Sequence, residues 1–166
     1  MTVTDPSVTG EQLRAAVGTF PSGVTVVTTL GADGTDVGLT VSAFSSLSLE
    51  PAMVVLAVDN TSSSLPWLTV GAPLGISVLA EGQGPIAHQF ARKGVDRFAG
   101  VGTHRGGGGV VLIDAAAAWF TGEIAAAFPG GDHTILTVAV HGCGTHDSAR
   151  PLLYQRGKVH DWPSGC

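Results

Sequence analysis

Short runs of β-branched and apolar residues, each bounded by glycine, proline or other turn residues, recur along this chain and constrain its fold more than any other feature. The runs are residues 24–30, 36–50, 52–58, 74–79, 110–113, 118–127 and 134–140. Runs of this kind between turn signals predict β-strands. No regular alternation of strand and helix, which a parallel sheet requires, connects them. The sequence therefore predicts a mainly β protein built as an antiparallel barrel, and not a doubly wound sheet.

A few short helices are expected between the strands. Thr9 and Gln12 have the spacing of a capping box, which predicts a short amphipathic helix immediately after Thr9. Apolar residues at spacings of four predict a second helix over residues 86–93, and residues 65–70 have a helical pattern as well. The glycine-rich stretch within residues 101–109 predicts a flexible loop.

Length and charge limit what the chain can be. Its 166 residues, 44% of them hydrophobic, suffice for one domain, which we place at residues 10–166 behind a flexible N-terminal tail at residues 1–9. A net charge of -5 argues against nucleic acid as a partner. The mean hydropathy of +0.33 in a sparsely charged chain predicts apolar surface that subunit association covers. We therefore expect a homo-oligomer.

The expected location is the cytoplasm. No apolar run reaches the length of a bilayer-spanning helix, and residues 1–9 lack the basic start and apolar middle of a signal peptide. The two cysteines, Cys143 and Cys166, provide no disulfide framework, which agrees with a reducing compartment. We expect both to be thiols and no membrane to be a partner.

The segment 36–50 is the first candidate for a ligand site. Its hydroxyl side chains include Thr40, Ser42, Ser45 and Ser46. Hydroxyls donate and accept hydrogen bonds in little space, and Gly38 and Ala43 would let a flat heterocycle approach the backbone. The alternative is the solvent face of a half-exposed strand, where serine and threonine are ordinary.

Two further segments can bind or react. The run of hydroxyls from Asn60 to Ser64 precedes the helical pattern near Leu65, so it predicts either an anion site or an ordinary helix N-cap. Asp132 and His133 follow two glycines at the entrance of a strand. His133 is the best candidate for an acid, base or hydrogen-bond donor, although Asp-His pairs also close turns.

Other common sites are not supported. The glycine run 106–109 is not followed by Lys-Ser/Thr, and the chain has no Gly-x-Gly-x-x-Gly unit and no Gly-x-Ser-x-Gly elbow. His141, Cys143 and His146 lie close together, but their spacing matches no familiar zinc motif, so we expect no metal and interpret the segment as a strand end that enters a loop.

Taken in order, several segments together resemble the flavin reductase family, the small reductase components of two-component flavin-dependent monooxygenases. The segments are 20–28, 38–51, 60–64, 90–98, 131–133 and 151–154. The resemblance runs from about Gly10 to Trp162. It implies an FMN-binding split barrel, an antiparallel Greek-key barrel with a few short helices, that forms a homodimer with the flavin at the subunit interface.

The resemblance also implies roles for particular residues. It implies that flavin, FMN or FAD, contacts Thr40, Val41, Ser42, Ala43, Phe44, Ser45, Asn60, Ser62, Ser63, Ser64, Phe90 and Lys93. Within this set, the stretch 40–45 would hold the isoalloxazine edge, and Asn60 with residues 62–64 would hold the phosphate. Phe90 and Lys93 would border the ribityl and phosphate side. His133 would be the catalytic residue where the nicotinamide of NADH or NADPH docks, with Tyr154 nearby.

Three functions remain open at this point. The first is NAD(P)H-dependent reduction of flavin, which a monooxygenase partner then uses. The second is a flavin-binding split-barrel oxidase or oxygenase that acts directly on a small molecule in a biosynthetic pathway. The third is a flavin carrier without catalysis.

Overall fold

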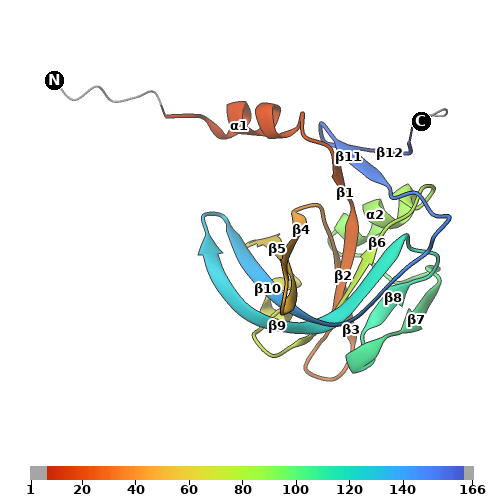
Figure 1. Ribbon diagram of the computed structural model, residues 1–166. Helices are drawn as coiled ribbons and strands as arrows, with labels where there is room; N and C mark the ends of the chain where they lie inside the picture. The colour runs from red at the N-terminus through yellow and green to blue at the C-terminus, as the bar shows by residue number, and fades with distance from the viewer. Residues whose placement is uncertain (1–6, 163–166) are drawn as a thin grey trace.

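A computed structural model describes residues 7–162, which form a strongly curved antiparallel sheet with helices outside it (Figure 1). The helices are α1 (Gly10–Val17) and α2 (Gly84–Ala91), with short 3-10 turns η1 (Leu65–Trp67) and η2 (Gly107–Gly109). The strands are β1 (Ser22–Gly23), β2 (Thr25–Leu30), β3 (Asp36–Val41), β4 (Phe44–Leu49), β5 (Ala52–Asp59), β6 (Pro73–Val78), β7 (Thr103–Arg105), β8 (Val111–Ile113), β9 (Ala118–Gly130), β10 (His133–Thr145), β11 (Leu153–Gln155) and β12 (Lys158–His160). Most of the expected tail at residues 1–9, and Cys166, lie outside the described residues.

The strand order explains why the main sheet closes into a barrel. Seven strands pair antiparallel in the order β3-β2-β6-β9-β10-β5-β4. β3 and β4 lie at opposite ends of this order, yet only Ser42 and Ala43 separate them along the chain. Because the three Cα–Cα steps from Val41 to Phe44 span at most about 11 Å, the sheet has to curl until its edges meet at this bend. The predicted antiparallel barrel is confirmed.

The bend corrects one expectation from the sequence. Residues 36–50 were expected to form one strand, but they form two, β3 paired with β2 and β4 paired with β5. The Phe44 amide donates to the Ser42 carbonyl at 3.0 Å, which makes a tight turn over three residues. Ala57 then donates to the Ala43 carbonyl at 3.0 Å and fixes the turn to β5. The hydroxyl-rich segment is therefore the corner of the barrel.

Strand β2 forms a wall between two apolar cores, which is why it is almost continuously hydrophobic or β-branched. Val27 faces the barrel interior and packs in the first core, whose other members include Leu56, Leu74 and Leu136. Val26 faces the opposite way and packs in a second core beneath α2 with Phe90 and Leu152. The second core fixes α2 against the outside of the barrel next to β3.

The expected helices are present near the predicted positions, with one difference. The Thr9 capping box is formed, since the Gln12 amide donates to Thr9 Oγ1 at 3.2 Å and the Thr9 amide to Gln12 Oε1 at 2.9 Å. Residues 65–70 form only the short turn η1. No helix among residues 7–162 is long and apolar enough to cross a bilayer.

Two segments expected to be loops are partly regular. β10 continues through His141 and Cys143 to Thr145 and pairs with β9 along this length. Gly144 permits this pairing, because a Cβ there would lie 2.7 Å from Nε1 of Trp119. Residues 101–109, expected to be flexible, contain β7 and η2, and Arg105 binds the Asp36 carboxylate with Nη2 to Oδ2 at 2.9 Å.

Helix α1 lies apart from the barrel at the upper end of β1 (Figure 1). None of its residues is buried, and Leu13, Val17 and the following Phe20 are exposed. Its end is held by the β11–β12 hairpin, since the Arg156 amide donates to the Gly18 carbonyl at 2.9 Å. The helix thus presents apolar side chains that this chain alone does not cover.

Candidate functional site

A cleft of about 310 Å³ lies over the corner between β3 and β4, and we call it the bend cleft. Its lining comes from β3, the bend, the end of β5, the following turn, α2 and the start of β10. The lining residues are Leu39, Thr40, Val41, Ser42, Ala43, Ala57, Val58, Asp59, Thr61, Ser62, Ser63, Phe90, Ala91, Lys93, Arg97 and His133. Most residues proposed from the sequence to bind a ligand therefore meet in one place.

The floor of the bend cleft is fixed by α2. Thr40 Oγ1 donates to the Ala87 carbonyl at 2.6 Å, so this hydroxyl holds the helix. Gly38 admits a flat ring as the sequence suggested, but that ring is Phe90, whose Cε1 would lie 2.7 Å from a Cβ at Gly38. Phe90 is fully buried, so its ring supports the cleft from beneath. Ala43 remains exposed at the corner.

One end of the bend cleft is polar and carries positive charge. The Lys93 ammonium lies 3.5 Å from the Thr61 carbonyl, at the same turn that carries Ser62 and Ser63. Arg97 also lines the cleft, and its Nη1 donates to Ser64 Oγ at 2.9 Å. Burial lowers the pKa of the Arg97 guanidinium, which nevertheless stays charged at neutral pH. This end suits an anionic group such as a phosphate.

Arg97 was not singled out from the sequence. Its Nε donates to the Arg92 carbonyl at 2.9 Å, and its Nη1 also donates to the Gly38 carbonyl. These bonds fasten the loop after α2 to β3. Only the tertiary structure brings this side chain to the cleft, although it lies in the stretch 90–98 on which the family resemblance partly rests.

Two of the proposed phosphate ligands lie outside the cleft lining. Ser64 is buried, donates to the Gly38 carbonyl at 3.4 Å and accepts from Arg97. Asn60 Nδ2 donates to the Gly131 carbonyl at 3.3 Å, and its Oδ1 accepts from Thr134 Oγ1 at 2.8 Å. η1 has no side-chain hydrogen bond at its N-cap. In this arrangement Asn60 and Ser64 position other residues.

Asn60 holds the turn that presents His133. Its two contacts fall on either side of His133, at Gly131 and Thr134. The His133 side chain is 40% exposed, and its Nδ1 lies 2.7 Å from Asp132 Oδ1. His133 thus lines the bend cleft with its Nδ1 paired to Asp132, and its Nε2 has no hydrogen-bond partner within residues 7–162.

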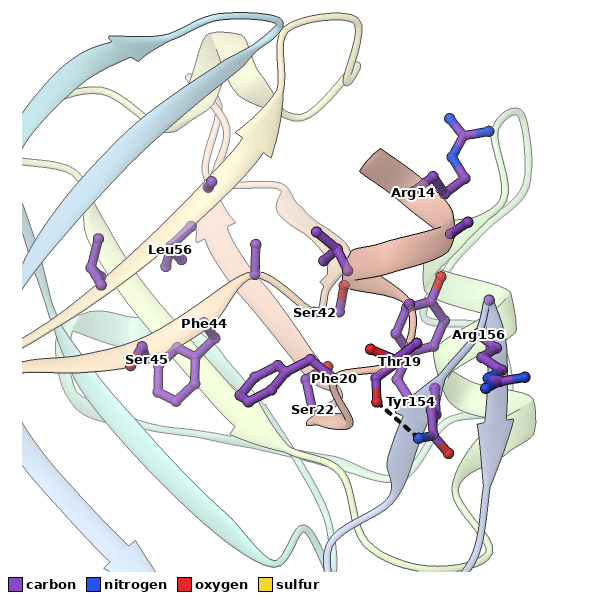
Figure 2. A pocket seen from close by; sticks show the side chains of 18 of the residues that line it. Arg14, Thr19, Phe20, Ser22, Ser42, Phe44, Ser45, Leu56, Tyr154 and Arg156 are labelled. Carbon is purple, nitrogen blue, oxygen red and sulfur yellow. Dashed lines mark hydrogen bonds between the residues drawn. The ribbon is translucent and has the colours of Figure 1, made fainter. Parts of the chain in front are cut away.

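A second, wider cavity of about 1080 Å³ lies between α1, β4 and the β1–β11 pair, and we call it the outer cavity (Figure 2). Phe44, Ser45 and Tyr154, which the sequence also proposed, line this cavity, and Figure 2 shows the ring of Phe20 pointing into it as well. Ser42, Ala43 and Ala57 line both cavities, so the two spaces meet at the bend. His133 and Tyr154 line different cavities and do not share one site within this chain.

Asp59 shapes the polar end and gives it a pH dependence. Hydrogen bonds from Thr61, of which the amide bond to Oδ1 is 2.6 Å, lower the pKa of the Asp59 carboxyl from its ordinary 3.8. A lowered folded-state pKa contributes stability that is complete above 3.8 and is lost as the pH falls through the folded-state value.

We therefore expect Asp59→Asn to cost more stability at pH 7 than at pH 3. Urea unfolding of both proteins at the two pH values measures this difference, and NMR titration of the wild-type carboxyl gives its pKa directly. A cost that does not depend on pH would contradict the assignment.

Comparison with known proteins shows the family of this chain. Residues 17–163 match the family described as Flavin reductase like domain. The chain belongs to this family. The predicted family and fold are confirmed, because this family member also superposes on the NADH:FAD oxidoreductase of Streptomyces globisporus C-1027 with a TM-score of 0.86, 33% identity and 98% coverage of both chains.

Curated relatives of this flavin reductase family member have more than one kind of name. The reductase component of a flavin-dependent trigonelline monooxygenase from Acinetobacter baylyi is 39% identical over 75% of the chain and 40% of that protein. The actinorhodin polyketide dimerase of Streptomyces coelicolor is 33% identical over 86% of the chain and 80% of that protein. The chain thus spans about two fifths of the length of the first of these two relatives.

Proposed function

We propose that this protein is an NADH-dependent flavin reductase that supplies reduced flavin to a separate monooxygenase. The observation that carries the proposal is the continuity of the bend cleft with the outer cavity at Ser42 and Ala43. The polar end of the cleft, with Lys93 and Arg97, suits the flavin phosphate, and the bend itself suits the edge of a planar ring. The space beyond the bend leaves room for a second ring to stack on the first.

Flavin held there would supply the redox chemistry, as the acceptor of a hydride from the nicotinamide. The chain orients the two substrates. Backbone amides and hydroxyls of Ser42, which lines both cavities, and of Ser45, which lines the outer cavity, would donate to the ring edge, where negative charge develops during reduction. His133 orients the nicotinamide through a hydrogen bond at Nε2, which accepts from the carboxamide NH2 when the imidazole is neutral and donates when it is protonated. Its pairing with Asp132 occupies Nδ1 and leaves Nε2 for the ligand, and the proposed reaction requires no proton transfer from His133.

A single assay tests this function. Purified protein is titrated with FMN and with FAD, and NADH or NADPH is then added without oxygen. Consumption of NADH that depends on added flavin, followed by release of reduced flavin, supports the proposal. Absence of turnover with either flavin and either nicotinamide would refute it.

The same proposal includes a homodimer. α1 exposes Leu13 and Val17, and the outer cavity beside it is wide and largely apolar in its lining, as at an interface that a second subunit completes. Tyr154 and His133 line separate cavities in one chain. In the proposed dimer, the outer cavity of one subunit and the bend cleft of the other enclose one nicotinamide. We also place the protein in the cytoplasm, in keeping with its sparse cysteines.

Replacing Leu13 with glutamate is expected to shift the protein from dimer to monomer, because it puts a charge on the apolar face of α1. Light scattering coupled to size-exclusion chromatography measures the mass. The control is Gln12→Glu, which adds a charge to the same helix at a polar position outside the outer cavity and keeps the capping box. A wild-type protein that is monomeric at high concentration would contradict the dimer.

A second candidate function is direct action on a small molecule with flavin held as a cofactor. The similarity to a polyketide dimerase and the width of the outer cavity favour it. Flavin that stays bound through purification, with no NADH consumption, would support this function against the first. Binding of flavin without either chemistry would indicate a carrier.

A further inference from the structure

A groove continues from the polar end of the bend cleft across the surface of the barrel. This groove, of about 290 Å³, is lined by Asp36, Val37, Gly38, Ser63, Ser64, Trp67, Gly94, Val95, Asp96, Arg97 and Phe98, and we call it the Trp67 groove. Ser63 and Arg97 line both the groove and the bend cleft. A ligand whose phosphate lies at Arg97 can therefore extend into the groove without leaving the protein surface.

The Trp67 groove has the chemistry of a nucleoside site. Trp67 is the last residue of η1, which directly follows the turn with Ser62 and Ser63. It is 39% exposed, so part of its indole is free to stack. Val95 and Phe98 supply further apolar lining. Stacking on an exposed aromatic side chain is a general way to hold a purine base, and it tolerates different bases. Carboxylates at the groove, such as Asp96, can accept from ribose hydroxyls.

Arg97 lies where two phosphates would meet. Its Nε and Nη1 bind the Arg92 and Gly38 carbonyls and Ser64, whereas its Nη2 has no hydrogen-bond partner within the described part of the chain. A guanidinium held on one side and open on the other is suited to a pyrophosphate that passes beside it. Lys93, on the bend-cleft side only, is suited to the phosphate nearer the flavin ring.

We propose that the Trp67 groove binds the adenosine half of FAD, so that this protein prefers FAD to FMN. The proposal rests on the proposed flavin reductase function, since it assigns the substrate of the same site. FMN would fill only the bend cleft and the corner. FAD would add the stacking on Trp67 and the second phosphate at Arg97.

The test compares FAD and FMN in wild type and in Trp67→Ala. Trp67→Ala is expected to raise KM for FAD about tenfold and to leave KM for FMN within about twofold, because loss of base stacking weakens binding by that order. Trp67→Phe, which keeps an aromatic face, is expected to fall between the two. AMP alone is expected to inhibit FAD reduction by wild type and to lose this effect in Trp67→Ala.

Trp162→Ala is the matched control, because Trp162 is 37% exposed and lines neither cavity nor groove. FMN kinetics of Trp67→Ala show whether the variant is folded. Equal KM values of wild type for FMN and FAD, or equal effects of Trp67→Ala on both, would overturn the proposal. If neither flavin is reduced, the reductase function fails. Calorimetric Kd values for FAD and FMN then still test whether the Trp67 groove binds the adenosine half of FAD.

Discussion

Gly122→Ala is expected to destabilise the protein by about 3 kcal/mol or more and to lower Tm by about 10 °C. Gly122 is buried in β9, between β6 and β10 in the middle of the barrel sheet. A Cβ there would lie 2.0 Å from the Ala139 carbonyl oxygen. Because the clashing atom belongs to the backbone of a central strand, no side-chain rotation relieves the contact, and the register of β9 and β10 has to shift.

The control for this substitution is Gly23→Ala. Gly23 also lies in a strand, β1, but a Cβ there meets no atom within 4 Å. Its replacement is expected to change the free energy of unfolding by less than about 0.5 kcal/mol. Urea unfolding and calorimetry measure both variants. Similar stabilities for the two would show that β9 and β10 tolerate a shift that the structure excludes.

His133→Ala is expected to lower kcat/KM for NADH about tenfold to a hundredfold and to leave flavin affinity nearly unchanged. Removing one partner of a hydrogen bond and leaving the other unsatisfied costs on the order of 1–3 kcal/mol, which corresponds to this range. Stopped-flow reduction under anaerobic conditions measures the hydride step, and fluorescence titration measures flavin binding. Reduction at the wild-type rate would remove His133 from the site.

His104→Ala is a closely matched control. His104 pairs with Asp114 at 2.7 Å, the same distance that joins His133 and Asp132, and it is similarly exposed. It belongs to β7 and lines neither of the two cavities nor the Trp67 groove. If only His133→Ala lowers kcat/KM, the effect comes from the pair at the bend cleft. It does not come from the loss of an Asp-His pair in general.

The sequence predicted the barrel because strand periodicity and turn residues are local signals. It did not reveal that residues 36–50 form two strands, since the break at Ser42 is set by the closure of the whole sheet and both halves alternate in the same way. The short strands β11 and β12 were missed for a similar reason. Three residues are too few for a period, and β11 is defined by its pairing with β1 from the other end of the chain.

The candidate site was only partly predictable. Thr40 to Ala43 are contiguous, so a local pattern could point to them, and the structure places them together with Lys93 and His133 in one cleft. Arg97 was missed because its relevance depends on the approach of a loop to β3. Asn60 and Ser64 were recognised as polar but not as internal partners, because the atoms they bind lie in distant segments.

The corner at Ser42 and Ala43 joins the two margins of the sheet, so a molecule laid across it touches both at once. Bound flavin should therefore hold the ends of β3 and β4 together. Amide hydrogens of these two strands should exchange more slowly when a flavin is present than when it is absent.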